Sequence, residues 1–338
     1  MTSVSVLMPC HNVAETIDET MESLLGQTHA DFEIVSVDDG SSDSSLIKLN
    51  AWAAKDERIR VIARPHTGII EALNAGLQTC VGDYVARMDA DDLAHPSRLE
   101  MQAAFLDSRE DISVVSSLVE GFPKEDLREG YKIYIDWLNS LVSHDEIVRE
   151  LFVESPLAHP SVMFRKELVL NIGAYQEHGW PEDYDLWLRL AQSGFRFAKV
   201  PELLVSWRDH PSRLTRTDSR YSVTNFLRAK AHYLMKGPLQ SRDALIIWGA
   251  GMMGKRLSKH LLDLGAPLQA FIDVDPKKIG RTRRGKAILA SSDLLELWNR
   301  HATPIVLAAV GARGARTLIR QELNGLGLIE GRDWWAAA

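Results

Sequence analysis

The first 92 residues alternate between short apolar segments of β-forming residues and segments whose apolar residues recur at helical spacing. Turn-forming Asp, Gly and Ser residues separate these segments. The alternation predicts a mostly parallel, doubly wound α/β sheet that binds ligands at the carboxyl ends of its strands. Strands are expected at 4–8, 32–37, 60–63 and 84–88, and helices at 15–25, 46–54 and 71–77.

Two acidic clusters lie at the ends of expected strands. Asp38 and Asp39 follow the second strand, and Asp89, Asp91 and Asp92 follow the fourth. In a parallel sheet both clusters open on the same edge, where grouped carboxylates repel one another unless a hard cation is held between them. The alternative is that each cluster is only a turn rich in aspartate. Both clusters together favour a ligand site.

The composition is that of an ordinary globular protein, with 338 residues, 45% hydrophobic and 25% charged, and a net charge of −7. No apolar run approaches the roughly 18 residues of a membrane span and no apolar leader is seen, so we expect a cytoplasmic protein. Residues 1–242 carry 25 Lys and Arg against 37 Asp and Glu, which argues against a nucleic-acid partner there. Cys10 and Cys80 cannot form a disulfide framework, and we expect both to be buried.

An ordered set of motifs resembles glycosyltransferase family 2, whose members have the GT-A fold. The set comprises VLMPCHN at 6–12, VDDGSSD at 37–43, ALNAGL at 72–77, GDYV at 82–85 and MDADD at 88–92. It continues with HPSVMFR at 159–165 and EDYDLWLRL at 182–190. A DxD triplet alone is weak evidence, whereas the ordered set across residues 3–212 is specific. The resemblance implies a doubly wound mixed sheet of GT-A type and sugar transfer from a nucleoside-diphosphate donor.

The resemblance also implies roles for the residues that bind the donor. Asp39 matches the carboxylate that accepts a hydrogen bond from the donor's pyrimidine, uracil or thymine, in a pocket shaped by Pro9 and Asn12. Asp91 matches a ligand of Mn²⁺ or Mg²⁺, and Asp89 matches a contact to the ribose or to a metal-bound water. Both metals prefer oxygen ligands and can bridge two phosphates.

The resemblance places the catalytic base at Asp183, at the start of a helix expected over 183–193, with Glu182 as the second candidate. One carboxylate acting through a single displacement would invert the anomeric configuration. The alternative for Asp183 is a helix N-cap. His210 lies where relatives carry a histidine that reaches the metal or the diphosphate, and the alternative is a surface histidine. Arg64 is either a phosphate contact or a solvated residue at a strand end.

Weaker candidates lie elsewhere in this part of the chain. His159 could line the acceptor site, and Trp180 and Trp187 could stack on an acceptor sugar, although Trp187 falls on the apolar face of its helix. A basic segment could contact anionic lipid headgroups or form a solvated helix face. Its residues are Arg213, Arg216, Arg220, Arg228 and Lys230.

The sequence predicts three parts: a GT-A domain at 1–215, a helical linker at 216–242 and a smaller Rossmann-like α/β domain at 243–338. In the last part, Gly249, Gly251 and Gly254 follow an expected strand and open a helix, and Asp273 ends the next strand. This spacing matches a dinucleotide-binding fingerprint, so NAD or another nucleotide is one expectation. A structural or oligomerisation role is the other.

We therefore expect a metal-dependent inverting glycosyltransferase that moves a sugar from a UDP- or dTDP-sugar to a hydroxyl of a glycan or lipid-linked glycan in cell-surface polysaccharide synthesis. Peripheral association with the inner face of the membrane and a homo-oligomeric state stay open. Two other functions stay open as well: an NAD-dependent oxidoreductase acting on a nucleotide sugar through the second domain, and a noncatalytic nucleotide-sugar sensor.

Overall fold

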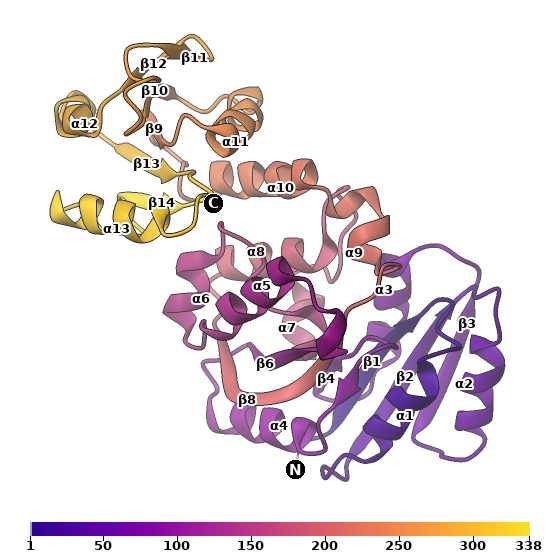
Figure 1. Cartoon of the computed structure of the whole chain (residues 1–338). Helices are drawn as coiled ribbons and strands as arrows, with labels where there is room; N and C mark the ends of the chain where they lie inside the picture. Colours follow the sequence, from indigo (N-terminus) through magenta and orange to yellow (C-terminus); the bar gives the residue numbers. More distant parts are fainter. Residues whose placement is uncertain (1) are drawn as a thin grey trace. The chain divides into compact units, whose positions relative to one another are not determined.

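The computed structural model describes residues 2–338, apart from the side chain of Asp126. The chain forms two compact units, each with its own β-sheet (Figure 1). The first unit contains residues up to 147 together with 156–178 and 182–217. The second contains 148–155, 179–181 and 218–338.

The first unit begins with the predicted alternation of strands and helices. Its parallel strands are β1 (Val4–Cys10), β2 (Phe32–Asp39), β3 (Ile59–Arg64) and β4 (Tyr84–Arg87), connected by α1 (Ile17–Leu25), α2 (Ser45–Ala53) and α3 (Ile69–Thr79). Both faces of β1 are buried, which explains its continuous apolar sequence. In the register, Cys10 pairs with Asp38 and Leu7 with Arg87, so the acidic strand ends lie at one edge of the sheet.

The rest of this sheet is mixed. The strand order is β3-β2-β1-β4-β7-β6-β8-β5, with β5 (Leu93–Ala94), β6 (Val114–Phe122), β7 (Met163–Arg165) and β8 (Phe197–Arg208). Strand β7 runs antiparallel to both β4 and β6. The prediction of an α/β chain with a doubly wound mixed sheet and a second, smaller α/β part is confirmed.

The sequence between 112 and 211 has an irregular pattern that indicates only short strands, and the structure of this unit differs from the sequence pattern in two respects. Strand β8 has 12 residues rather than being short, because pairing with β6 carries it through Pro201 and Glu202, which break the apolar pattern. Two helices were also missed: α4 (Arg98–Ser108) has a weakly amphipathic sequence, and α5 (Glu129–Asn139) contains Gly130 and three aromatic residues. The other helices of this unit are α6 (His144–Glu150), which continues into the second unit, α7 (Lys166–Asn171), α8 (Glu182–Gln192) and α9 (Leu214–Thr217).

The second unit holds a six-stranded sheet in the order β11-β12-β10-β9-β13-β14. Its strands are β9 (Ala244–Trp248), β10 (Leu268–Ile272), β11 (Thr282–Arg283), β12 (Lys286–Leu289), β13 (Pro304–Ala308) and β14 (Trp334–Ala336). All neighbouring pairs except β11 with β12 are parallel. Its helices are α10 (Val223–Lys236), α11 (Met252–Asp263), α12 (Leu294–Trp298) and α13 (Ala315–Gly325).

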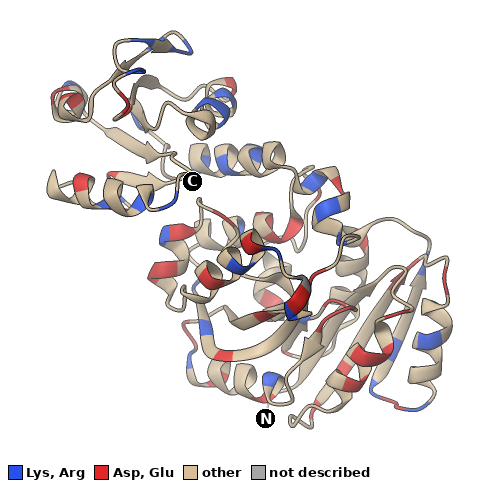
Figure 2. Ribbon diagram, viewed as in Figure 1, with Lys and Arg blue, Asp and Glu red and all other residues tan. Residues whose placement is uncertain are grey.

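The basic residues predicted to face lipid or water make contacts within their own units. Figure 2 shows Lys and Arg along α10, but Lys230 on that helix is buried and donates a hydrogen bond to the Val153 carbonyl at 2.6 Å. In the first unit Arg213 and Arg216 both pair with Asp209, at 3.6 and 2.6 Å. The prediction of a fully solvated or lipid-facing segment is therefore wrong for Lys230, which is used to support the 148–155 segment.

None of the helices among the described residues is both long enough and apolar enough to cross a membrane.

Candidate active site

Asp39 ends β2, and the backbone that follows β3 surrounds its carboxylate. The Thr67 and Gly68 N–H groups each donate a hydrogen bond to it at 2.9 Å, and the Thr67 hydroxyl adds a third at 3.2 Å. Burial opposes ionisation of Asp39, but these bonds outweigh it and lower the pKa of the carboxyl group. Asp39 is therefore a fixed anion at the carboxyl edge of the sheet.

Two histidines lie against Asp39. The rings of His11 and His66 stack with centroids 4.3 Å apart, and each Nδ1 lies about 3 Å from the Asp39 backbone oxygen, at 2.9 and 3.0 Å. A carbonyl oxygen only accepts, so each Nδ1 carries a proton. These three residues offer ligand atoms within 4.8 Å of one another, but protonated Nδ1 atoms have no lone pair for a metal.

Asn12 joins the loops that follow β1 and β2. Its Oδ1 accepts a hydrogen bond from the Ser42 N–H at 2.8 Å, and its own N–H donates to the Ser41 hydroxyl at 3.0 Å. Its φ of 52° is in the left-handed region, which asparagine tolerates better than most residues. Pro9 precedes this loop and pairs in register with Val37. Both residues that were expected to shape the base pocket thus lie beside the end of β2.

The second acidic cluster follows β4. Asp89, Asp91 and Asp92 each offer a carboxylate oxygen within 4.8 Å of the others. Asp92 is buried, and its Oδ2 has no hydrogen-bond partner. Burial first, and then the charges of Asp91 and Asp89, raise the pKa of Asp92 well above its ordinary value. The three carboxyl groups therefore lie close enough to repel one another when they are ionised.

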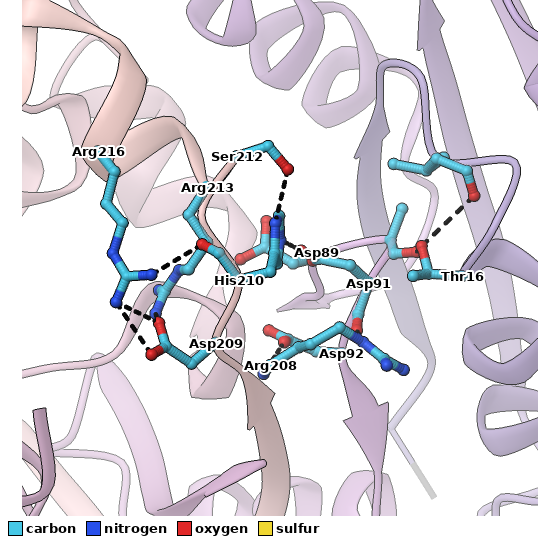
Figure 3. Close-up of polar contacts among 12 residues, drawn as sticks. Thr16, Asp89, Asp91, Asp92, Arg208, Asp209, His210, Ser212, Arg213 and Arg216 are labelled. Atoms are coloured by element: carbon cyan, nitrogen blue, oxygen red, sulfur yellow. Dashed lines mark hydrogen bonds and ion pairs between the residues drawn. The ribbon is translucent and has the colours of Figure 1, made fainter. Parts of the chain in front are cut away.

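A segment at the end of β8 closes over this cluster (Figure 3). The Arg208 N–H donates to Asp92 Oδ1 at 2.7 Å, and its side chain donates to the Asp91 carbonyl at 2.6 Å. His210 Nε2 lies 2.8 Å from Asp91 Oδ2, while its Nδ1 contacts the Ser212 hydroxyl at 2.9 Å. The structure thus brings His210 to Asp91, as expected for a metal or diphosphate contact.

Arg87 lies between the DxD carboxylates and the predicted base. Its guanidinium is buried and pairs with Asp89 at 2.5 Å. Its charge also acts on Asp183, whose pKa is raised to about 8, mainly by burial and then by Glu182, with Arg87 opposing that rise. Asp183 is therefore a carboxyl group with a pKa close to neutral, as a general base requires. Its Oδ1 also accepts a hydrogen bond from the Tyr184 N–H at 2.7 Å at the start of α8.

The two acidic clusters share one neighbour, the Cys10 thiol at the end of β1. Burial raises the pKa of Cys10, and the charges of Asp38, Asp89 and Asp91 raise it further. Arg87 acts on the same thiol with the opposite sign. Cys10 is thus a buried thiol, as expected, and it pairs in register with Asp38 at the end of the neighbouring strand.

The weaker candidates are placed differently. His159 is buried and contacts the Tyr175 hydroxyl through Nε2 at 2.9 Å, and burial lowers its pKa. Trp187 is fully buried in the core and Trp180 is buried against His232 in the second unit. Arg64 is half-buried and lies 4.0 Å from Glu71. Of these four, Arg64 is placed beside an acidic cluster, because it pairs in register with Asp39 on the neighbouring strand.

In the second unit two of the three predicted glycines are needed for packing. A Cβ on Gly254 would lie 1.8 Å from the Gly249 carbonyl oxygen, and Gly249 itself has a φ of +113°. A Cβ on Gly251 would meet nothing within 4 Å. Asp273 accepts hydrogen bonds from the Ala250 and Asp275 N–H groups, and Lys278 contacts both of its oxygens. The carboxylate expected to bind a ribose is thus held by its own unit.

Sequence reasoning missed several residues at the site, namely His11, His66, Thr67, Arg87 and Arg208. His66 and Thr67 lie in the loop after β3, separated from it by Pro65, so their position near a strand end was the signal that could have marked them. Arg87 lies within β4, and its role depends on burial, which the sequence alone did not indicate.

The model of the family described as "Glycosyl transferase family 2" matches residues 5–173. The chain belongs to this family. It is accordingly a glycosyltransferase, and the expectation drawn from the motifs is confirmed.

Relatives in the family come from several bacteria. The amylovoran biosynthesis glycosyltransferase AmsE of Erwinia amylovora is 33% identical over 60% of this chain and 75% of its own length. An uncharacterized glycosyltransferase of Haemophilus influenzae is 31% identical over 61% of this chain and 65% of its own length. A UDP-Gal:alpha-D-GlcNAc-diphosphoundecaprenol beta-1,3-galactosyltransferase of Escherichia coli is 27% identical over 68% and 82%.

Solved structures share the fold at low identity. Residues 1–349 of TarS from S. aureus, in complex with UDP-GlcNAc, give a TM-score of 0.56 at 18% identity, covering 77% of this chain and 71% of that one. The mannosyltransferase PcManGT of Pyrobaculum calidifontis, in complex with GDP-Man and Mn²⁺, gives 0.51 at 18% identity, covering 69% and 62%.

The acidic cluster of this family member fits a divalent cation. Mn²⁺ and Mg²⁺ take oxygen ligands, and Asp89, Asp91 and Asp92 bring carboxylate oxygens close together. The buried Asp92 Oδ2 has no hydrogen-bond partner, so this oxygen has an acceptor position left for a cation. The residues present therefore suit a hard divalent ion, with an imidazole nitrogen of His210 beside them.

Proposed function

We propose that this chain is a metal-dependent inverting glycosyltransferase that transfers a sugar from a UDP- or dTDP-sugar to a hydroxyl of a glycan or lipid-linked glycan. The observation that carries the proposal is that two acidic strand ends lie at one edge of the sheet, with Asp38 paired in register with Cys10 and Arg87 bonded to Asp89 of the second cluster. Carboxylates from distant parts of the chain thereby surround one end of the sheet, where this fold binds its ligands.

Asp39 is the proposed contact to the nucleobase. Its low pKa keeps it anionic, and an anionic carboxylate accepts the N–H of a uracil or thymine ring. Pro9 and Asn12 border this position, with Arg64 assigned to the phosphates. The E. coli relative is named for UDP-Gal and TarS was solved with UDP-GlcNAc, which supports a uridine nucleotide as donor.

Asp91, Asp89 and His210 are proposed to hold Mn²⁺ or Mg²⁺ together with the donor diphosphate. When bound, the ion would neutralise charge that grows on the leaving diphosphate. PcManGT was solved with Mn²⁺, which supports the choice of metal. Arg208 contributes by fixing the Asp91 backbone and the Asp92 carboxylate in place.

Asp183 is the proposed general base, with Glu182 as the second candidate. It would take the proton of the acceptor hydroxyl as that oxygen attacks the anomeric carbon from the face opposite the diphosphate. A single displacement of this kind inverts the anomeric configuration. Glu182 is buried next to it and raises its affinity for the proton.

The acceptor and the setting are also part of the proposal. AmsE is named for amylovoran biosynthesis and the E. coli relative for a diphosphoundecaprenol acceptor. We assign the reaction to cell-surface polysaccharide synthesis, in the cytoplasm at the inner face of the membrane. We keep 1–215 as the catalytic domain, 216–242 as a helical linker and 243–338 as a separate domain. An NAD-dependent oxidoreductase is not favoured, because Asp273 is already held by Lys278 and two backbone N–H groups.

A donor panel tests this function. UDP-Gal, UDP-Glc, UDP-GlcNAc and dTDP-Glc are each incubated with Mn²⁺ and lipid-linked or free glycan acceptors, and the released nucleoside diphosphate is measured. The proposal predicts release that requires Mn²⁺ and an acceptor and is lost in Asp91→Ala. Asp111→Asn, which alters only two exposed ion pairs, with Arg109 and Arg196, serves as the control and should behave as the wild type. Equal release by Asp91→Ala would contradict the proposal.

A further inference from the structure

A donor atom faces every acceptor position of the Asp39 carboxylate in this structure. An ionised carboxylate has about four lone-pair positions. Two on Oδ1 accept from the Thr67 N–H and hydroxyl. Oδ2 accepts from the Gly68 N–H at 2.9 Å and also lies 2.9 Å from His66 Nδ1, whose one proton is directed to the Asp39 backbone oxygen at 3.0 Å as well. A nucleobase can therefore bond to this carboxylate only by replacing one of these donors.

Three of the four donors are difficult to remove. The Thr67 and Gly68 N–H groups belong to the backbone that leads into α3, and the Thr67 hydroxyl is attached to the same turn. His66 is different because its side chain is 60% exposed, whereas that of Asp39 is 5% exposed. Water can solvate the imidazole as soon as it turns away.

The backbone of His66 is fixed, so only its ring can move. Gly40, with a φ of +68°, lies against it so closely that a Cβ there would be 2.5 Å from the His66 nitrogen. The loops that follow β2 and β3 are thus in direct backbone contact. Departure of the imidazole is a rotation of the side chain and needs no movement of the loop.

We propose that the His66 imidazole occupies the nucleobase position on Asp39 in the empty site and that the donor's base has to displace it. The base then donates its ring N–H to the oxygen that His66 Nδ1 leaves. His66 therefore weakens donor binding and selects for bases that can supply such a donor. The inference rests on the proposed nucleotide-sugar function.

The exchange leaves no other group of Asp39 without a partner. When His66 turns away, His11 Nδ1 still donates to the Asp39 backbone oxygen at 2.9 Å. The Gly68 N–H still donates to Oδ2. The base replaces the contact of His66 Nδ1 with Oδ2, whereas His66 gives up its bond to the backbone oxygen and His11 loses the ring stacked on it.

Titration of UDP into the protein in the presence of Mn²⁺ tests the exchange. One hydrogen bond contributes a net factor of about three to ten in a binding constant, so His66→Ala should bind UDP about three- to tenfold more tightly than the wild type. His11→Ala is the matched variant, because His11 contacts the same carbonyl but does not donate to the carboxylate. It should not bind UDP more tightly. N3-methyl-UDP lacks the ring N–H, and His66→Ala should gain no affinity for it.

Nitrogen NMR of the histidine side chains gives a direct readout. On addition of UDP and Mn²⁺, the Nδ1 signal of His66 should change from that of a hydrogen-bonded to that of a solvated imidazole, while the signal of His301 in the second unit stays unchanged. Unchanged or weaker UDP binding by His66→Ala, or an unchanged His66 signal, would overturn the inference.

The two proposals fail in different ways. If UDP and dTDP do not bind the wild type with Mn²⁺, both the proposed function and this inference are wrong. If UDP binds and Asp39→Asn weakens it, but His66→Ala has the wild-type affinity, the function stands and only the displacement of His66 is wrong.

Discussion

His210 Nε2 lies 2.8 Å from the Asp91 carboxylate, although 119 positions of sequence separate the two residues. The contact brings the end of β8 to the loop after β4, and Arg208 strengthens it with two further hydrogen bonds to that loop. We predict that His210→Ala weakens Mn²⁺-dependent donor binding by about 10- to 100-fold, as loss of a metal ligand or of its direct partner does. The measurement is the Mn²⁺ concentration that half-saturates UDP binding. Ser212→Ala removes only a bond to His210 Nδ1, so it should raise this half-saturating Mn²⁺ concentration far less than His210→Ala does.

The pKa of Asp183 predicts how the activity depends on pH. A base must be unprotonated, and the pKa of Asp183 in the free enzyme is about 8. The ratio kcat/KM should therefore rise with pH up to about 8 and level off above it. A profile that is flat between pH 6 and 9 would contradict the assignment of the base to Asp183.

Asp183→Asn separates catalysis from stability. The variant should retain UDP binding and lose transfer by a factor on the order of 10² or more. The folded-state pKa of Asp183 lies above the ordinary 3.8, so this group costs stability increasingly as pH rises from 3.8 toward 8. Asparagine carries no charge, so the melting temperature of the variant should exceed that of the wild type at pH 8 to 9. Equal melting temperatures there would show that Asp183 is not a costly buried charge.

Two glycines of the second unit form a matched pair for a packing test. Gly254→Ala places a Cβ 1.8 Å from the Gly249 carbonyl oxygen, so helix α11 has to move away from β9. We expect a loss of about 3 kcal/mol or more, beyond the gain of up to about 1 kcal/mol from helix propensity. Gly251→Ala meets no atom within 4 Å and should change stability by less than about 1 kcal/mol. Urea denaturation followed by circular dichroism measures both, and equal losses would contradict the packing described.

Glu150 is a buried carboxylate that pairs with two arginines of α13. Arg320 contacts it at 2.8 Å, and Arg316 donates to its other oxygen. We predict that Glu150→Ala costs about 3 kcal/mol, because it leaves both guanidinium groups without their shared partner. A matched change at the exposed pair, Glu296→Ala, should cost less than about 1 kcal/mol. The urea concentration at the midpoint of unfolding is measured for both variants. A similar shift of this midpoint in the two would contradict the prediction.

The sequence predicted β1, β2 and β4 well because their apolar runs are buried on both faces, and turn-forming aspartates stand at or just after the ends of β2 and β4. Residues that act at strand ends, Asp39 and Asp91, were found for the same reason. The length of β8 was not predicted, because its pairing with β6 overrides the break at Pro201. Arg87 and His66 were not predicted either, since burial and the packing of two loops across Gly40 give them their positions.

The central claim is that distant aspartates bind one ligand together. The most direct test measures UDP binding with and without Mn²⁺ in the wild type, Asp39→Asn and Asp91→Asn. In the wild type Mn²⁺ should strengthen UDP binding. Asp91→Asn should abolish that strengthening and leave metal-free binding intact, whereas Asp39→Asn should weaken binding with and without the metal. If Mn²⁺ strengthens UDP binding to Asp91→Asn as much as to the wild type, the carboxylates of this site do not hold the metal and the nucleotide together.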